Sequence, residues 1–152
     1  MPVRYQIDDV NRLVIATGHG MLTDQEVFEY KQSVWSLPAV AGYDELIDLR
    51  DVKRLDVPTA ERLRELARLS AAMDVRNPSK VAIVSDNPVT VEVARTYQVL
   101  RKLDPRSTRK VSVFLTVEQA AHWLRPPGQK RRAQKSMQRR PLPGDPDPTK
   151  GH

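Results

Sequence analysis

The segment that most restricts the fold is residues 81–86, VAIVSD, in which four apolar residues follow one another without a polar break. Valine and isoleucine favour strands, and an uninterrupted apolar strand is typical of a sheet that is covered on both faces. Stretches with helical periodicity lie on either side, at residues 58–74 and 87–104. A strand between two helices predicts strand–helix–strand units with parallel pairing and right-handed crossovers.

The rest of the chain up to Leu124 extends this pattern. Apolar and polar residues alternate at residues 3–8, which indicates a half-buried strand, and the turn DDVN leads into a second strand that we expect to pair antiparallel with the first. Thr23 and Glu26 have the spacing of a capping box, and Pro38 ends the helix that they begin. The predicted strands are residues 3–8, 12–20, 43–51, 81–86 and 109–116, and the predicted helices are residues 23–36, 58–74, 87–104 and 116–124. The expected fold class is α/β, in the order ββαβαβαβα, with a five-stranded mixed sheet packed with four helices.

The positive charge of the chain is confined to its end. The 152 residues carry a net charge of +6, and residues 125–152 hold eight lysines and arginines against two aspartates, which accounts for the whole excess. The same segment has six of the twelve prolines and almost no apolar residues, so it cannot bury enough surface to offset the entropy of ordering. We therefore expect a compact domain over residues 1–124 and a disordered basic tail over residues 125–152.

Two absences narrow the class of protein. The chain has no cysteine, which excludes disulfides and thiolate metal sites. No apolar run approaches the length of a membrane span, and the first ten residues lack the apolar core of a signal peptide. We expect a cytoplasmic protein without a membrane span.

Acidic residues crowd the end of the predicted third strand, a place where α/β proteins often keep their sites. Asp48, Asp51 and Asp56 precede Pro58 and Thr59 there. One interpretation is local: the aspartates end the strand, Asp56 or Thr59 caps the next helix, and Pro58 lies near its first position. The other interpretation is a recognition loop for a partner. The segment lacks the ligand spacing and central glycine of a calcium loop, and we expect no metal at these carboxylates.

The chain offers no recognisable catalytic set. His19 and His122 have no nucleophile in an elbow context nearby and do not form a pair four residues apart. The sequence TGHG at residues 17–20 is too short for a dinucleotide fingerprint. Histidines in such settings are mostly structural. We therefore expect a protein that is not an enzyme and that holds no cofactor.

Aromatic side chains recur on the predicted helices at Phe28, Trp35 and Tyr97. Their ordinary role would be to cover the sheet. The alternative is that they line an apolar pocket between the helices and the sheet.

Six cations crowd the first half of the tail. Such a run attracts phosphate in a sequence-independent and salt-dependent way, and without interleaved aromatic residues we expect no base stacking. A solubilising chain end accounts for the run equally well. The six residues are Lys130, Arg131, Arg132, Lys135, Arg139 and Arg140. Binding of a nucleic acid or an anionic surface to the tail therefore stays open.

The element order and three short motifs resemble the STAS fold, in its SpoIIAA-like branch, to which lipid-binding SEC14-type domains are related. The motifs are GMLT at residues 20–23, IDLRDV at residues 47–52 and VSVFLTVEQAAHWL at residues 111–124. The resemblance covers residues 3–124 and implies the α/β fold together with a partner-docking loop before the second helix.

The phosphorylation site of the resembled family is altered in this chain. Anti-sigma-factor antagonists of this fold carry a phosphorylatable serine directly after an aspartate at the start of the second helix. The aspartate falls on Asp56 here, but the next residue is Val57, which has no hydroxyl group. Thr59, two residues later, is the remaining hydroxyl that could accept a phosphate. The resemblance therefore implies a docking loop without the usual phospho-serine switch.

From these observations we expect a non-enzymatic regulatory module that binds a protein partner, with a homodimer left open. The expected partner-binding residues are Asp51, Asp56, Val57, Thr59, Asp86 and Asn87. One alternative is a carrier of a small apolar ligand such as a lipid, which the SEC14-type relatives imply. The other alternative is polyanion binding through the tail.

Overall fold

The computed structural model describes residues 3–74 and 78–125, which form one five-stranded sheet with four α-helices in the expected order. The strands lie in the order β1-β2-β3-β4-β5; β1 pairs antiparallel with β2, and the other neighbours pair in parallel. The strands are β1 (Val3–Asp8), β2 (Leu13–Leu22), β3 (Asp44–Leu55), β4 (Ser79–Val84) and β5 (Arg109–Phe114), and the helices are α1 (Asp24–Val34), α2 (Ala60–Met73), α3 (Pro88–Leu103) and α4 (Val117–Leu124). The predicted fold class is confirmed.

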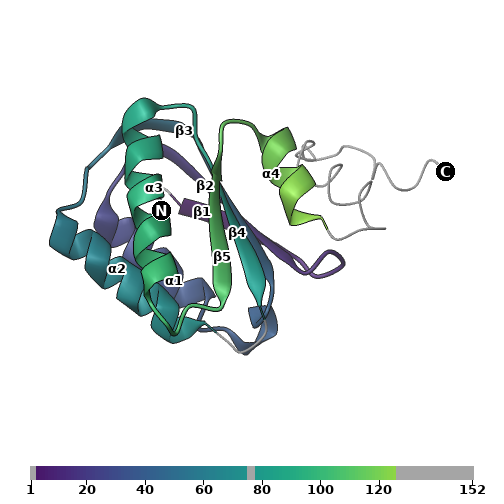
Figure 1. Ribbon diagram of the computed structural model, residues 1–152. Helices are drawn as coiled ribbons and strands as arrows, with labels where there is room; N and C mark the ends of the chain where they lie inside the picture. Colours follow the sequence, from purple (N-terminus) through teal and green to yellow (C-terminus); the bar gives the residue numbers. More distant parts are fainter. Residues whose placement is uncertain (1–2, 75–77, 126–152) are drawn as a thin grey trace, which may run out of the picture.

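Helices cover both faces of the sheet. α1, α2 and α3 lie together on one face, and α4 lies on the opposite face (Figure 1). β4 shows the reason, because Val81 and Ile83 belong to a core formed with α2 and α3, whereas Ala82 and Val84 belong to a core formed with α4. The strand is therefore buried on both faces, as its uninterrupted apolar sequence predicted.

Side-chain caps begin the helices where the sequence predicted their starts. The Thr23 hydroxyl accepts a hydrogen bond from the backbone N–H of Glu26, whose carboxylate accepts one from the backbone N–H of Thr23. Asn87 caps α3 and Thr116 caps α4, each through its side-chain oxygen. The α-helices of the described residues are 8 to 16 residues long, and no helix there is long and apolar enough to cross a membrane.

The main departure from the predicted elements is at the end of β3. The sequence predicted a strand that ends at Asp51 and a loop from there to Thr59, but β3 continues to Leu55. Its last residues pair in parallel with the end of β2 beyond two shifts in register. Such bulges let two strands stay paired past an irregularity, and the period of the side chains does not show them. Asp51 therefore belongs to a strand, opposite His19, and the loop consists of residues 56–59.

Smaller differences affect other boundaries. β2 continues two residues beyond its predicted end at Gly20, because the same pairing with β3 extends it. β4 begins and ends two residues earlier than predicted, and β5 ends two residues earlier. A single turn of 3-10 helix at Pro38–Val40, which the sequence did not predict, connects α1 to β3.

Candidate functional site

The carboxyl ends of two neighbouring parallel strands bring two loops to one edge of the sheet. Residues 56–59 follow β3 and lead into α2, and residues 85–87 follow β4 and lead into α3. Two aspartates of this edge are exposed, and two valines beside them keep 56% and 52% of their surface in solvent. We call the following residues the strand-end surface: Asp56, Val57, Asp86 and Val89.

Helix capping does not account for Asp56. The cap of α2 is Thr59, whose Oγ1 accepts a hydrogen bond from the backbone N–H of Arg62 at 3.1 Å. Pro58 lies before this cap and not at the first helical position where the sequence placed it. The backbone N–H of Asp56 donates to the carbonyl of Leu22 at 2.8 Å, which holds the loop to β2. The Asp56 carboxylate makes no hydrogen bond or ion pair with another described residue.

The other two aspartates of this region lie within β3. Asp48 is 6% exposed and accepts hydrogen bonds from Arg50 Nε at 2.9 Å and Nη2 at 2.8 Å, so its charge is neutralised locally. Asp51 is exposed near the end of the strand. Within residues 3–74 and 78–125, no group of three or more histidine, aspartate or glutamate side chains is arranged to hold a metal ion.

The capping role of Thr59 gives a first testable prediction. Replacing Thr59 with alanine leaves an amide of the first turn of α2 without its acceptor, and we expect the free energy of unfolding to fall by about 1 kcal/mol. Thr59→Asp should keep nearly all of the stability, since aspartate caps as well as threonine. Urea denaturation of the three proteins measures both effects, and equal midpoints for wild type and Thr59→Ala would contradict the assigned cap.

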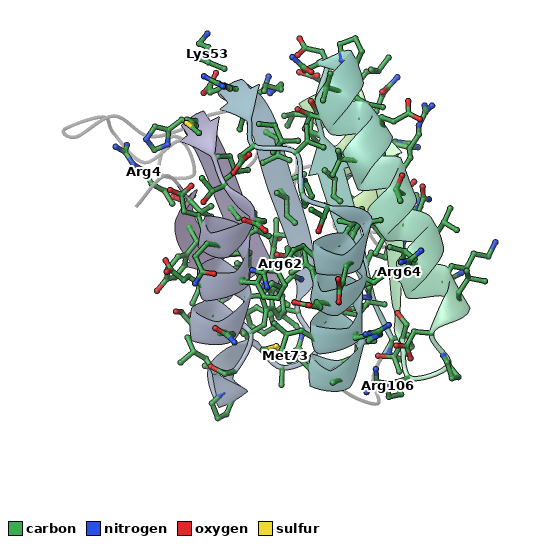
Figure 2. The ribbon with its side chains drawn as sticks, turned by 90° about the vertical axis from the view of Figure 1, so that its left-hand side faces the viewer. Arg4, Lys53, Arg62, Arg64, Met73 and Arg106 are labelled. Atoms are coloured by element: carbon green, nitrogen blue, oxygen red, sulfur yellow. The ribbon has the colours of Figure 1, made fainter. Side chains whose placement is uncertain are left out.

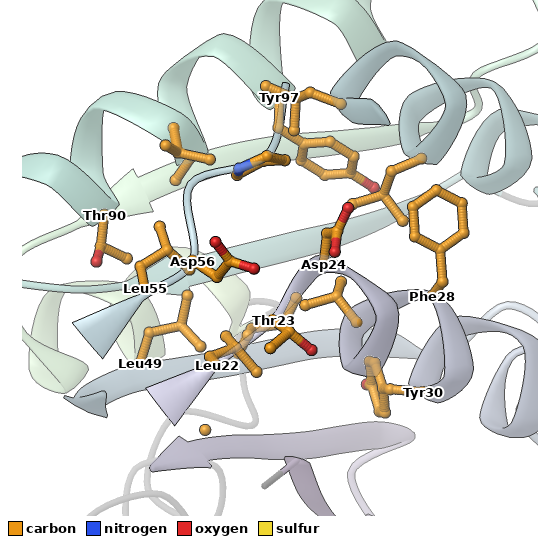
Figure 3. A pocket seen from close by; sticks show the side chains of 18 of the residues that line it. Leu22, Thr23, Asp24, Phe28, Tyr30, Leu49, Leu55, Asp56, Thr90 and Tyr97 are labelled. Carbon is orange, nitrogen blue, oxygen red and sulfur yellow. The ribbon is translucent and has the colours of Figure 1, made fainter. Parts of the chain in front are cut away.

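An apolar cavity of about 110 Å³ lies beneath the loop of residues 56–59, between the sheet and the three helices α1, α2 and α3. Leu22 and Leu49 line it from the sheet, Phe28 from α1 and Tyr97 from α3 (Figure 3). The surface that these residues present to the cavity is almost wholly apolar. Two of the three aromatic residues considered for a pocket thus lie in its wall.

Arg62, which also lines the cavity, bridges α2 to α1. Its Nε donates to Asp24 Oδ2 at 3.0 Å, its Nη1 donates to Glu65 Oε2 at 2.8 Å, and its Cζ lies 4.1 Å from the centroid of the Phe28 ring. Figure 2 shows Arg62 in the space between the two helices. One third of the side chain remains exposed, so this bridge can open without the exposure of a large core.

A buried polar cluster, which the sequence analysis missed, surrounds Glu45 of β3. Glu45 Oε1 lies 3.3 Å from both Lys31 Nζ and Arg109 Nη1, and Oε2 accepts hydrogen bonds from the Tyr30 hydroxyl at 2.5 Å and from Trp35 Nε1 at 3.0 Å. The Arg109 guanidinium lies 4.0 Å from the centroid of the Trp35 ring. Trp35 therefore belongs to this cluster and does not line the cavity, which was the alternative role considered for it from the sequence.

Two cations share one carboxylate in this cluster. Burial by itself raises the pKa of Glu45, but Lys31, Arg109 and the hydrogen bond from Tyr30 together outweigh it and hold that pKa below its ordinary value of 4.5. Burial and the adjacent carboxylate raise the pKa of Tyr30 well above its ordinary value of 10.0. Tyr30 therefore stays protonated and donates to an ionised Glu45 at neutral pH.

A second buried pair joins α3 to the end of α2. The Nη2 atom of Arg101 donates to both carboxylate oxygens of Asp74, at 2.8 and 2.7 Å, and Nη1 donates to the Tyr97 hydroxyl at 2.8 Å. The Tyr97 hydroxyl donates in turn to Ser70 Oγ at 2.9 Å, and Asp74 accepts a further bond from the backbone N–H of Thr108. This network fixes the polar end of Tyr97 while its ring lines the cavity.

The remaining residues singled out from the sequence belong neither to the cavity lining nor to the two buried polar networks. His19 lies in β2, and Nδ1 of His122 lies 2.8 Å from Nη2 of Arg125. Asn87 serves as the cap of α3. The tail cations lie outside the described residues: Lys130, Arg131, Arg132, Lys135, Arg139 and Arg140.

Comparison with known proteins identifies the fold. No family model matches the chain, and no curated protein matches it. Among solved structures, the chain is similar to an uncharacterised protein of the DUF3478 family from Shewanella loihica PV-4, which is described as having a SpoIIAA-like fold. The TM-score is 0.50 at 19% sequence identity, over 81% of this chain and 92% of that chain. At this identity the likeness establishes the SpoIIAA-like fold and no more.

Proposed function

We propose that this chain with a SpoIIAA-like fold is a non-enzymatic regulatory module that binds a protein partner through its strand-end surface. The observation that carries the proposal is that Asp56 and Val57 are exposed and have no structural task within the domain. Thr59 caps the helix, and the backbone of Asp56 holds the loop to β2, so neither side chain is needed for folding. The carboxyl ends of parallel strands are where α/β proteins commonly place binding sites, and an exposed carboxylate there offers a partner a charge to contact.

The position of Thr59 supports a regulatory variant of the same proposal. Thr59 is exposed at the N-terminus of α2, where a phosphate group would meet free amides and the positive end of the helix dipole. Phosphorylation there would add negative charge beside Asp56 and alter partner binding. The usual serine position is Val57, so Thr59 is the residue that we propose for modification.

A photo-crosslinking experiment tests the docking proposal. The full-length protein, carrying a photoreactive phenylalanine analogue at position 57, is irradiated in its own cells. We expect one dominant crosslinked partner, and we expect Asp56→Lys to reduce its yield about fivefold or more, since loss of one interfacial charge contact typically costs about 1 kcal/mol or more. The matched control carries the analogue at Val10, which is 69% exposed in the turn between β1 and β2 at the opposite edge of the sheet.

Two results would contradict this proposal. One is the same set of crosslinked proteins from positions 57 and 10, which would indicate random encounters. The other is an Asp56→Lys protein with a lowered Tm, because that would assign Asp56 a structural role. A retained Tm with a reduced yield supports docking.

The size of the cavity argues against a lipid carrier. An engineered protein cavity of about 150 Å³ holds benzene, and the cavity of this chain measures about 110 Å³. A complete acyl chain would need α1 and α2 to separate widely. Polyanion binding by the tail remains a prediction from the sequence, because the tail lies outside the described residues.

A further inference from the structure

The cavity beneath the loop of residues 56–59 has the chemistry of a ligand site for an uncharged apolar molecule. Its walls come from the sheet and the helices, including Leu22 and Leu49 of the sheet and Phe28 of α1. Their lining is almost wholly apolar, and an apolar lining of this kind accepts hydrocarbon rings. A charged or strongly polar ligand would lose its hydration there without gaining hydrogen bonds.

The volume sets the size of the ligand. A volume of about 110 Å³ accommodates a molecule of about one six-membered ring, and a larger ligand would project past Arg62 towards solvent. The Arg62 bridge to Asp24 lies partly in solvent, so its opening gives a small ligand a path into the cavity without unfolding of the sheet.

The cavity and the docking loop share residues. Asp56 and Pro58 both line the cavity, and Val57 between them is exposed to solvent. A ligand in the cavity therefore packs directly against the inner side of the segment whose outer side belongs to the strand-end surface. Filling the cavity removes the space into which the loop can move, so the loop fluctuates less and loses less entropy when a partner binds.

We infer that a small uncharged apolar molecule, about the size of a benzene ring, occupies this cavity and strengthens partner binding at the strand-end surface. The inference rests on the proposed docking function, and it assigns a ligand class and a mode of regulation to that site. It requires two separable properties, namely binding in the cavity and coupling of the bound ligand to the loop.

Benzene, added to the full-length protein, tests both properties. At ten times its dissociation constant, we expect Tm to rise by roughly 3 °C or more. If the loop opens only when the cavity is empty, the amide of Asp56, whose N–H is bonded to the carbonyl of Leu22, should exchange about elevenfold more slowly at the same concentration. Amides of the turn between β1 and β2, at residues 9–12, serve as the internal control and should exchange at an unchanged rate.

Two variants of the lining make the test specific. Ala94→Leu places a larger side chain in the cavity wall and should abolish the effect of benzene on Tm. Because that variant risks overpacking, Leu63→Ala provides a second measurement: it enlarges the cavity, and naphthalene, which should not stabilise the wild type, should then raise Tm. An unchanged response in both variants would place the benzene elsewhere and overturn the assignment.

The coupling is tested separately from docking itself. The yield of the crosslink from position 57 without benzene measures docking. We expect benzene to raise that yield about threefold or more, and this increase measures the coupling. A partner that crosslinks equally well with and without bound benzene would overturn the regulatory inference while docking stands. Absence of the position-57 crosslink, with benzene still bound in the cavity, would overturn the docking function and with it the regulation. No change in Tm or exchange with benzene would overturn the ligand site.

Discussion

Replacing Glu45 with glutamine is expected to lower the free energy of unfolding by about 3–5 kcal/mol, one of the two largest effects that we predict. Glu45 is fully buried and is the carboxylate shared by Lys31 and Arg109. The substitution keeps the shape of the side chain and leaves two buried cations without a counter-charge. The loss of stability comes from the two unpaired buried charges. In an ordinary core substitution it would come from the removal of side-chain volume.

The effect of pH follows from the same cluster. The pKa of Glu45 in the folded protein lies below its ordinary value of 4.5, so the ionised carboxylate stabilises the fold above that pH. This contribution is lost as the pH falls from about 4.5 through the lower folded-state pKa. The stability of wild type should therefore approach that of Glu45→Gln on acidification.

Guanidinium denaturation at pH 7 and at a series of lower pH values measures both effects. Glu29→Gln, the same substitution at an exposed position of α1, is the control and should change stability little at either pH. A Glu45→Gln protein as stable as wild type at pH 7 would show that the two cations do not depend on this carboxylate. A difference between the two proteins that grows on acidification would contradict the direction of the pKa shift.

The second large effect is expected at Arg101. Arg101→Met keeps the length and apolar stem of the side chain but leaves Asp74, 3% exposed, as a buried carboxylate without its cation, and we expect a loss of about 3–5 kcal/mol. The hydroxyl of Tyr97 loses its hydrogen bond to the guanidinium as well. Because Tyr97 lines the cavity, the substitution should also loosen one wall of the proposed ligand site.

A double-mutant cycle isolates the pair. Asp74→Asn combined with Arg101→Met should be less destabilised than the sum of the two single variants, because the double variant buries no unpaired charge. Arg106→Met provides the matched control, since the Arg106 side chain is 54% exposed where it pairs with Asp104 and its loss should matter far less. Strict additivity in the cycle would show that Arg101 and Asp74 act independently and would contradict the ion pair.

These two networks explain why the proposed docking edge can vary without loss of the fold. Glu45 ties α1 to the sheet through its charge pairs with Lys31 and Arg109, and Arg101 ties α3 to the end of α2 through Asp74. The side chains of the strand-end surface, in contrast, make no hydrogen bond or ion pair with another residue that the structure describes. We therefore expect substitutions in the networks to lower Tm and substitutions at Asp56 to change binding alone.

Local patterns in the sequence determined the architecture. The apolar run at residues 81–84 predicted a strand buried on both faces, and Thr23 with Glu26 predicted the start of α1. Both features depend on residues within one or two turns of each other, so the periodicity of a single segment is enough to show them. The element order followed from such segments taken in sequence.

The tertiary structure decided which side chains meet. Lys31 and Arg109 are 14 and 64 residues from Glu45, and only the crossovers of the sheet bring the three together. The sequence showed only a glutamate at an inward-facing position of β3 and did not indicate which residues it contacts. Two other features also depend on contacts between distant segments. One is the bulged pairing with β2 that extends β3 past Asp51, and the other is the hydrogen bond that places Trp35 in the polar cluster. Contacts between distant segments depend on how the helices pack on the sheet, and no local pattern in a single segment encodes that packing.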